Sequence, residues 1–175
     1  MADFLANYQA HVAERAAMGI PPLPLSAEQT AALIEALKVA SADDAAELLN
    51  LLTHRVPPGV DDAAQVKASF LSAVAHGDVA VAALSRQRAT ELLGTMVGGY
   101  NVKPLIDLLD DDSVGEAAAQ GLKHTLLMFD AFHDVADKAK AGHARAQAVL
   151  QSWADAEWFT SRPEVPPSLT VTVFK

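Results

Sequence analysis

The chain has no cysteine among its 175 residues. This absence excludes disulfide bonds, a thiolate nucleophile, a zinc–cysteine site and an iron–sulfur cluster that this chain holds in the usual way. A chain of this length buries about 70% of its unfolded surface, so it needs no disulfide or metal to fold. Because domains cluster near about 100–150 residues, we expect one hydrophobic core.

Basic residues are scarce. Lys and Arg number 13 against 22 Asp and Glu, giving a formal charge of −9 and a pI near 5.0. Such a charge repels nucleic-acid phosphates and anionic lipid headgroups, so neither nucleic acid nor a membrane is an expected partner of this chain alone. No apolar run approaches the roughly 18 residues of a membrane span, and residues 1–4 lack the basic start of a signal peptide. We therefore expect a cytoplasmic protein.

Aromatic residues are few, with two Trp, two Tyr and six Phe, whereas alanine occurs 35 times. Alanine has the highest helix propensity, and strands prefer aromatic and β-branched side chains. The composition therefore predicts an all-α fold.

Capping and stop signals divide the chain into short helices. Ser26 and Gln29 form a capping box at one helix start. Further helix starts are predicted at Ser41, at Asp61 or Asp62, and at Ser85. Glycines and prolines end the helical segments. The apolar spacing predicts antiparallel helices over residues 3–18, 26–39, 41–55, 61–77, 85–93, 104–110, 113–129, 132–141 and 143–159.

Two segments depart from the helical pattern. Three glycines in eight residues predict an irregular loop over Gly94–Asn101, which lacks the Gly-Lys-Ser/Thr ending of a phosphate-binding P-loop. Residues 162–167 read as a proline-rich linker, and Leu169–Lys175 alternates apolar and polar residues as a strand does. A single strand after an all-α domain has no partner within this chain.

Several sequence blocks, taken together and in order, resemble one family over nearly the whole chain. They are His11–Arg15, Arg55–Asp61, Glu91–Met96, Gly98–Asn101, His124–Asp130, Gln151–Phe159 and Leu169–Lys175. The family that they resemble is the N-terminal HEAT-like domain of bacterial aconitase B.

This resemblance implies a HEAT-like solenoid or bundle over residues 1–160, followed by a linker and the first strand of a swivel domain over residues 161–175. It implies that the chain is a fragment of an aconitate hydratase, which interconverts citrate and isocitrate through cis-aconitate in the citric acid cycle. The family's [4Fe-4S] cluster would be held by three cysteines far downstream. No catalytic, metal or cofactor-binding residue is carried over, so this chain alone is expected not to be an enzyme.

The expected role is interaction. The resemblance implies that the chain packs beside the catalytic domains, helps shape the substrate channel, and contacts another subunit or a citric-acid-cycle enzyme. The glycines of the loop suit a close backbone approach, and Tyr100 and the tryptophans are amphipathic rings suited to an interface. The candidate interface residues are Gly98, Gly99, Tyr100, Asn101, Trp153 and Trp158.

Other interpretations have less support in the residues. Asp130, His133 and Asp137 share a helical face, but three possible ligands do not define a metal site. The run Asp110–Asp112 is better explained as helix capping than as paired catalytic carboxylates. A stand-alone helical adaptor and a regulatory RNA-associated module remain the alternative functions, and the sequence downstream of Lys175 would separate the adaptor from the enzyme domain.

Overall fold

Helices form the regular structure of the computed structural model, which describes residues 2–125 and 128–157. In these ranges the structure has no strand beyond one isolated bridge between Val81 and Leu84, so the all-α prediction is confirmed. No helix in the described ranges is long and apolar enough to cross a membrane. The helices are α1 (Ala2–Ala17), α2 (Ala27–Lys38), α3 (Ala42–His54), α4 (Asp62–His76), α5 (Arg86–Gly94), α6 (Val102–Asp107), the 3₁₀ helix η1 (Leu108–Asp110), α7 (Gly115–Lys123), α8 (Met128–Lys140) and α9 (Ala144–Ala154).

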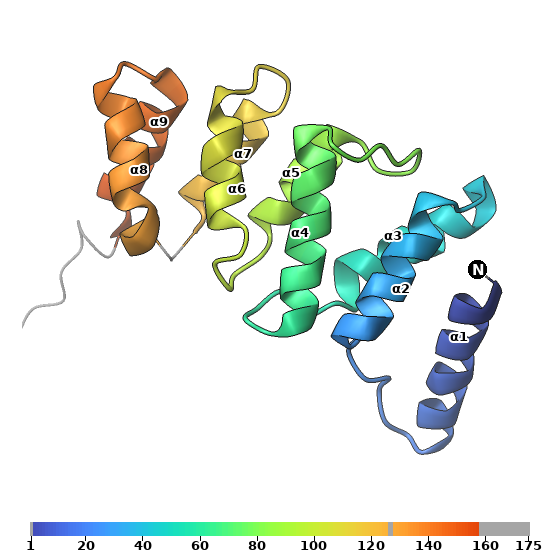
Figure 1. Ribbon diagram of the computed structural model, residues 1–175. Helices are drawn as coiled ribbons and strands as arrows, with labels where there is room; N and C mark the ends of the chain where they lie inside the picture. The colour runs from blue at the N-terminus through green and yellow to red at the C-terminus, as the bar shows by residue number, and fades with distance from the viewer. Residues whose placement is uncertain (1, 126–127, 158–175) are drawn as a thin grey trace, which may run out of the picture.

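The helices pack as successive antiparallel pairs. Figure 1 shows α2 with α3, α4 with α5, α6 with α7, and α8 with α9 side by side in an elongated row, with α1 at one end. The even-numbered helices lie along one side of the row and their partners along the other. This is a helical bundle of short antiparallel pairs, and its assignment as a HEAT-like solenoid stays a prediction.

Helix starts follow the capping residues of the sequence. The Ser26 hydroxyl accepts a hydrogen bond from the Gln29 amide at 3.2 Å, and the Gln29 side chain accepts one from the Ser26 amide at 2.9 Å. This reciprocal arrangement confirms the predicted capping box. Ser41 and Ser85 cap α3 and α5 by accepting a hydrogen bond from the amide of Asp44 and of Arg88 respectively, and Gly77 ends α4 with a φ of +89°.

The core lies between the two layers of helices and continues along the row. Leucines supply much of it, because each amphipathic helix turns its apolar stripe towards its partner and towards the next pair. Fully buried examples are Leu33, Leu52, Leu71, Leu93, Leu105, Leu109 and Leu122.

The predicted single helix over residues 113–129 is wrong, because α7 ends at Lys123 and α8 begins at Met128. The Trp153 indole donates a hydrogen bond to the Leu122 carbonyl at 2.9 Å. A continuing helix would use that carbonyl as an acceptor four residues later. Here the Thr125 amide donates to it at 3.2 Å, so α7 ends in a tighter turn, and the indole from α9 adds a tertiary contact to the same carbonyl.

The start of α7 also differs from the prediction. Ser113 does not cap it, since the N-cap residue is Val114, which makes no side-chain cap. The Asp111 carboxylate instead accepts hydrogen bonds from the backbone amides of Ser113 and Val114 at 2.8 and 3.2 Å.

Two further boundaries bear on the candidate interface. Gly94 belongs to α5 and not to the following loop, which starts at Thr95. The last predicted helix begins at Ala144 with His143 as its N-cap. The predicted end of that helix at Phe159, the linker over residues 162–167 and the strand over residues 169–175 all lie outside the described residues.

Candidate interaction surface

Two loops that lie far apart in the sequence touch at one end of the helix pairs. These paired loops are residues 56–61, before α4, and residues 95–101, before α6, and Figure 1 shows them together below α4 and α6. The Val97 amide donates a hydrogen bond to the Pro58 carbonyl at 2.9 Å, and the Tyr100 hydroxyl donates one to the Val60 carbonyl at 3.1 Å. The loops are thus fixed to each other by one hydrogen bond between backbone groups and one from the Tyr100 side chain to a backbone carbonyl.

Glycine is required at this contact. A Cβ atom on Gly98 would lie 1.8 Å from the Gly59 carbonyl oxygen, far inside van der Waals contact. Gly99 has a φ of +95°, in the left-handed region that favours glycine. The paired loops therefore use one glycine for close approach and the other for backbone conformation.

Asn101 has a structural role within the same loop. Its side chain is buried, and its Nδ2 donates hydrogen bonds to the carbonyls of Leu93 and Met96 at 2.8 and 3.1 Å. These carbonyls belong to the C-terminal end of α5 and its following turn, where backbone acceptors lack helical partners. Asn101 thus holds the loop from inside and offers no surface to another molecule.

The outer side of the paired loops is apolar. Val60 and Val97 are 76% and 67% exposed, and Tyr100 is 36% exposed. Rigid loops that present apolar and amphipathic side chains are typical of binding surfaces. We call Val60, Val97 and Tyr100 the loop patch. Val60 was not among the candidate residues, because its neighbourhood with residues 97–100 depends on packing between distant segments.

The two tryptophans of the candidate interface fall in different places. Trp153 is buried at 4% exposure, and the indole bond to Leu122 satisfies its only polar group. Its ring belongs to the core between α7 and α9, so it offers no surface for docking. Trp158 lies outside the described residues, so its place in an interface stays a prediction.

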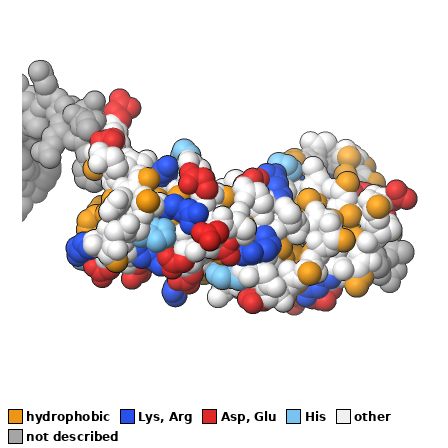
Figure 2. All heavy atoms as spheres, turned by 90° about the horizontal axis from the view of Figure 1, so that it is seen from above, with side chains coloured by type: hydrophobic (Ala, Val, Ile, Leu, Met, Phe, Trp, Pro, Cys, Tyr) orange, Lys and Arg blue, Asp and Glu red, His pale blue; other side chains and the backbone are white. Residues whose placement is uncertain are grey.

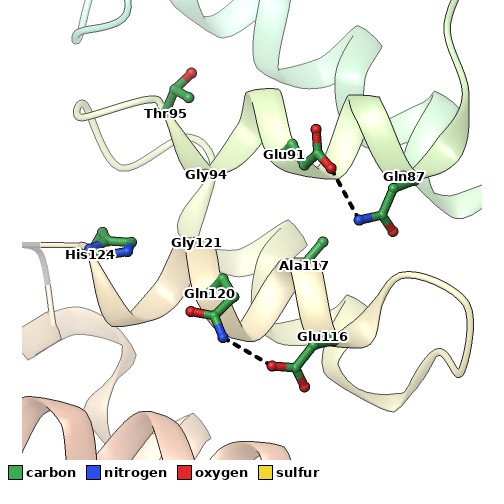
Figure 3. Close-up of a pocket in the computed structure, with 9 residues that line it drawn as sticks. All are labelled: Gln87, Glu91, Gly94, Thr95, Glu116, Ala117, Gln120, Gly121 and His124. Carbon is green, nitrogen blue, oxygen red and sulfur yellow. Dashed lines mark hydrogen bonds between the residues drawn. The ribbon is translucent and has the colours of Figure 1, made fainter.

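A shallow groove of about 370 Å³ lies between α5 and α7 (Figure 3). At its floor the helices meet at Gly94 and Gly121, where a Cβ on either residue would lie 2.9 Å from the Cα of the other. Glutamates stand on both sides, and each accepts a hydrogen bond from a glutamine four residues away in its own helix. Glu91 also pairs with Arg88, and these hydrogen bonds hold the pKa of Glu91 below its ordinary value. This close contact explains why residue 94 is glycine: Gly94 lets α5 and α7 pack closely, and it is not part of a loop.

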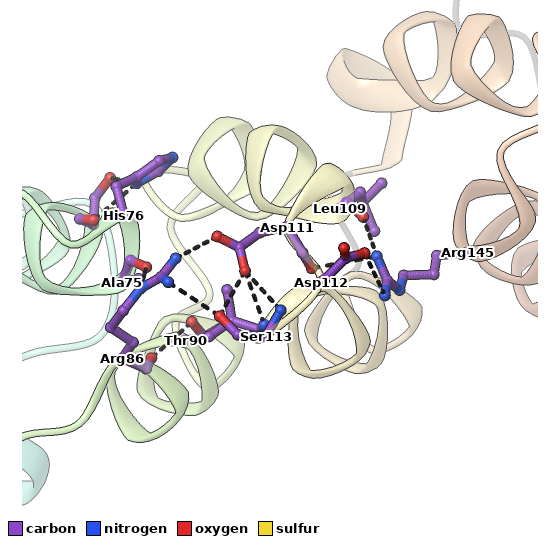
Figure 4. A network of polar contacts seen from close by, with 11 residues as sticks. Ala75, His76, Arg86, Thr90, Leu109, Asp111, Asp112, Ser113 and Arg145 are labelled. Atoms are coloured by element: carbon purple, nitrogen blue, oxygen red, sulfur yellow. Dashed lines mark hydrogen bonds and ion pairs between the residues drawn. The ribbon is translucent and has the colours of Figure 1, made fainter.

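Acidic residues at the turn between η1 and α7 connect successive helix pairs. Arg86 of α5 contacts the Asp111 carboxylate, donates to the Ser113 hydroxyl at 3.0 Å, and donates to the Ala75 carbonyl of α4 at 2.8 Å (Figure 4). The hydrogen bonds from Ser113 and then from Arg86 hold the pKa of Asp111 far below its usual range. These contacts tie α4, α5 and the turn together.

The following helices bind the same turn from the other side. Arg145 of α9 donates to the Leu109 carbonyl at 2.8 Å, and Lys138 of α8 pairs with Asp110 at 2.5 Å. Figure 2, which looks onto this end of the helix pairs, shows basic, acidic and His side chains gathered over its middle. The run 110–112 therefore connects successive helix pairs. Within it, Asp111 is the residue that caps a helix start, because its carboxylate accepts from the backbone amides just before α7.

Lys67 is an unusual core residue. Its side chain is 1% exposed, and its Nζ donates to the Thr53 carbonyl at 3.2 Å. Thr53 lies in the last turn of α3, where backbone carbonyls lack helical N–H donors and a positive charge is favourable. Burial lowers the pKa of Lys67 to about 8. The sequence of α4 does not predict that Lys67 is buried, since lysine is normally exposed.

Within residues 2–125 and 128–157, no group of three or more His, Cys, Asp or Glu side chains could hold a metal ion. His133 and Asp137 are exposed on α8, and the Asp130 side chain lies outside the described part.

Stacked helix pairs with an apolar loop patch and a partly buried polar connector define an all-α domain of the helical-bundle class. Residues 7–159 match the family described as Aconitate B N-terminal domain. The match covers most of the chain, which therefore belongs to this family.

Curated relatives agree with this assignment. The chain is 60% identical over 171 residues to Aconitate hydratase B of Pseudomonas aeruginosa and to that of Escherichia coli. It is 44% identical over 177 residues to Aconitate hydratase B of Helicobacter pylori. These alignments cover 98–100% of the chain but only 20% of each relative. The chain thus spans about a fifth of the length of these relatives.

Proposed function

We propose that this chain is a non-catalytic interaction domain of an aconitate hydratase, which interconverts citrate and isocitrate through cis-aconitate. The family match and the relatives named Aconitate hydratase B support the parent activity. The domain would occupy residues 1–160, and residues 161–175 would lead into the next domain. It would pack against the catalytic domains in the cytoplasm and help shape the path of substrate to them.

The residues of this chain do not fit the iron–sulfur cluster of such an enzyme. Cluster iron is normally held by cysteine thiolates, and the sequence has none. No step of the reaction is therefore assigned to this chain. In the proposed arrangement the cluster and the substrate-binding groups belong to the remaining four-fifths of the enzyme.

The observation that carries the proposal is the loop patch. Val60, Val97 and Tyr100 are exposed, yet their loops are held by hydrogen bonds and by the close contact of Gly98 with Gly59. A rigid apolar surface loses little conformational entropy when a partner covers it, so it is well suited to docking. Burying such side chains also recovers hydrophobic free energy.

The test uses the full-length enzyme with Tyr100→Ala together with Val97→Ser. We expect weaker protection of the loop patch from hydrogen exchange, and turnover lowered by about tenfold, if about 1.4 kcal/mol of docking free energy is lost. Tyr8→Ala is the control, because it is the same substitution at the other tyrosine, which lies in α1 and outside the loop patch. Unchanged turnover and exchange in the loop variant would contradict the proposal, and loss of helical circular dichroism would instead make Tyr100 a core residue.

A further inference from the structure

Two arginines from different parts of the chain hold the connection between α1 and α2. Arg15, in the last turn of α1, donates from Nε to the Pro21 carbonyl at 2.9 Å. Arg55, which follows α3, donates from one terminal nitrogen to the Pro22 and Leu23 carbonyls at 2.5 and 3.1 Å. Figure 1 shows this connection running below α1 and α2. The two side chains, both partly buried, therefore meet at one short stretch of backbone.

These two arginines differ from the others in the described ranges. Arg86, Arg88 and Arg145 each lie within 4.0 Å of a carboxylate oxygen. Arg15 and Arg55 pair with no carboxylate among the residues that the structure describes, although the whole chain has 22 Asp and Glu. Backbone carbonyls accept their hydrogen bonds, but a carbonyl carries no net charge. Two positive charges are thus held at this place without a negative partner in the described chain.

Both guanidinium groups also keep hydrogen-bond donors in reserve. An arginine side chain has five N–H donors in a fixed fork. Towards the described residues, Arg15 donates from Nε alone and Arg55 from a single terminal nitrogen. The Nε of Arg55 is buried and has no acceptor there, which is an unfavourable state for a polar group. The backbone of the connection therefore satisfies only part of what these side chains can bind.

The two guanidinium groups are close enough for one small molecule to contact both. They donate to the carbonyl oxygens of adjacent residues, Pro21 and Pro22. Standard bond lengths together with the two hydrogen bonds place the donating nitrogens at most about 12 Å apart. The planar fork of an arginine matches a carboxylate through two parallel hydrogen bonds. Two forks at this separation favour a ligand that carries at least two carboxylates a few bonds apart.

We propose that Arg15 and Arg55 form a binding site for a small polycarboxylate, at the connection between α1 and α2. The ligand bridges the end of α1 and the end of α3. It thereby fastens α1 to the row, where no described side chain of α1 over residues 4–17 is fully buried. The proposal is carried by the two arginines and does not depend on the aconitate hydratase assignment.

The test is an NMR titration of the 175-residue chain with citrate at constant ionic strength, following the Nε–Hε signals of the arginines. We expect saturable shifts at Arg15 and Arg55, none at the ion-paired Arg88, and slower hydrogen exchange in α1. Acetate, which has one carboxylate, and pyrophosphate, which has two compact phosphates, are the comparison ligands. Both should bind at least about tenfold more weakly than citrate, a difference of about 1.4 kcal/mol or more.

Variants separate this site from general charge attraction. Arg15→Gln should weaken citrate binding about tenfold with helical circular dichroism unchanged, and Arg15→Lys, which keeps the charge but not the fork, should weaken it less. Arg88→Gln is the matched control, because it removes the same charge from α5, and it should leave the affinity unchanged. Shifts that do not saturate, or equal losses in Arg15→Gln and Arg88→Gln, would overturn the proposal. Equal binding of acetate, or tighter binding of pyrophosphate, would overturn the polycarboxylate assignment.

Discussion

The terminal helix α1 and the central helices α4–α7 use apolar residues in different ways. In α1, Phe4, Leu5 and Tyr8 are only partly buried, and none of its described side chains over residues 4–17 is fully buried. In the centre, side chains such as Leu71 and Leu93 have no exposed surface. A helix at the end of the row has a neighbour on one side only, so its apolar stripe cannot be fully covered.

Polar contacts show the same contrast. α1 is tied to the segment that follows it by His11, which accepts a hydrogen bond from the Leu23 amide at 3.1 Å, and by Arg15, which donates to the Pro21 carbonyl at 2.9 Å. These contacts are exposed, and exposed polar contacts contribute little free energy. The central connector around Asp111 instead links three helices through partly buried groups. Stability in this fold is therefore expected to depend on position along the row.

The strongest test of tight central packing is Gly98→Ala. The new methyl group would lie 1.8 Å from the Gly59 carbonyl oxygen, so the paired loops must separate. We expect the free energy of unfolding to fall by about 4 kcal/mol or more, the range of severe steric substitutions. Urea unfolding followed by circular dichroism would measure it.

The control for this substitution is Gly19→Ala, just after α1. Gly19 has a φ of +70° with nothing within 4 Å of its Cβ position, so only backbone strain of about 1 kcal/mol is expected. Equal losses for the two variants would show that the paired loops can move apart freely.

A matched pair of leucines compares the two regions directly. Leu93→Ala removes a side chain with 0% exposure and should cost about 2–5 kcal/mol through lost burial and a cavity. Leu5→Ala in α1 removes a partly buried side chain and should cost about 1 kcal/mol. Chemical denaturation of both variants measures the difference. Similar losses would mean that α1 is integrated into the core as firmly as α5.

Lys67 gives the central region a pH dependence. Its pKa of about 8 in the folded protein is lower than the ordinary 10.5, so between these values the unfolded chain binds a proton that the folded protein does not. The free energy of unfolding should therefore rise with pH, by about 2 kcal/mol from pH 8 to pH 9.5 for this group.

Lys67→Met removes that contribution while keeping a side chain of similar length. The stability of the original protein relative to Lys67→Met should increase over the same pH interval. A constant difference between the two proteins would show that Lys67 keeps its ordinary pKa and is hydrated in the folded state.

Local signals predicted most helix boundaries, because caps act within a few residues. Examples are the N-caps Ser26, Ser41 and Ser85 and the C-cap Gly77, whose hydrogen-bond partners lie within a few residues of each cap. The break between α7 and α8 could not be predicted in this way. At this break the indole of Trp153, 31 positions away in the sequence, donates a hydrogen bond to the Leu122 carbonyl, which no local pattern indicates.

The candidate surface was only partly accessible to sequence reasoning for the same reason. Glycine content drew attention to residues 98–101, and the structure exposes Tyr100 there but buries Asn101. An asparagine side chain can face solvent or donate to backbone carbonyls inside the protein, and the sequence pattern does not distinguish these two positions. Val60 joins the loop patch only because residues 56–61 pack on residues 95–101, which is a fact of tertiary structure.

The order of the helix pairs also has a consequence for how the chain folds. The principal contacts join helices that are next to each other or one helix apart along the chain, such as α2 with α4, α4 with α5, and α5 with α7. Short sequence separation between contacting elements lowers the loop-closure entropy of the folding transition state, and such proteins fold fast. During synthesis, α2–α5 can assemble their shared core before the ribosome has delivered α8 and α9, so the row is suited to growth from its N-terminal end.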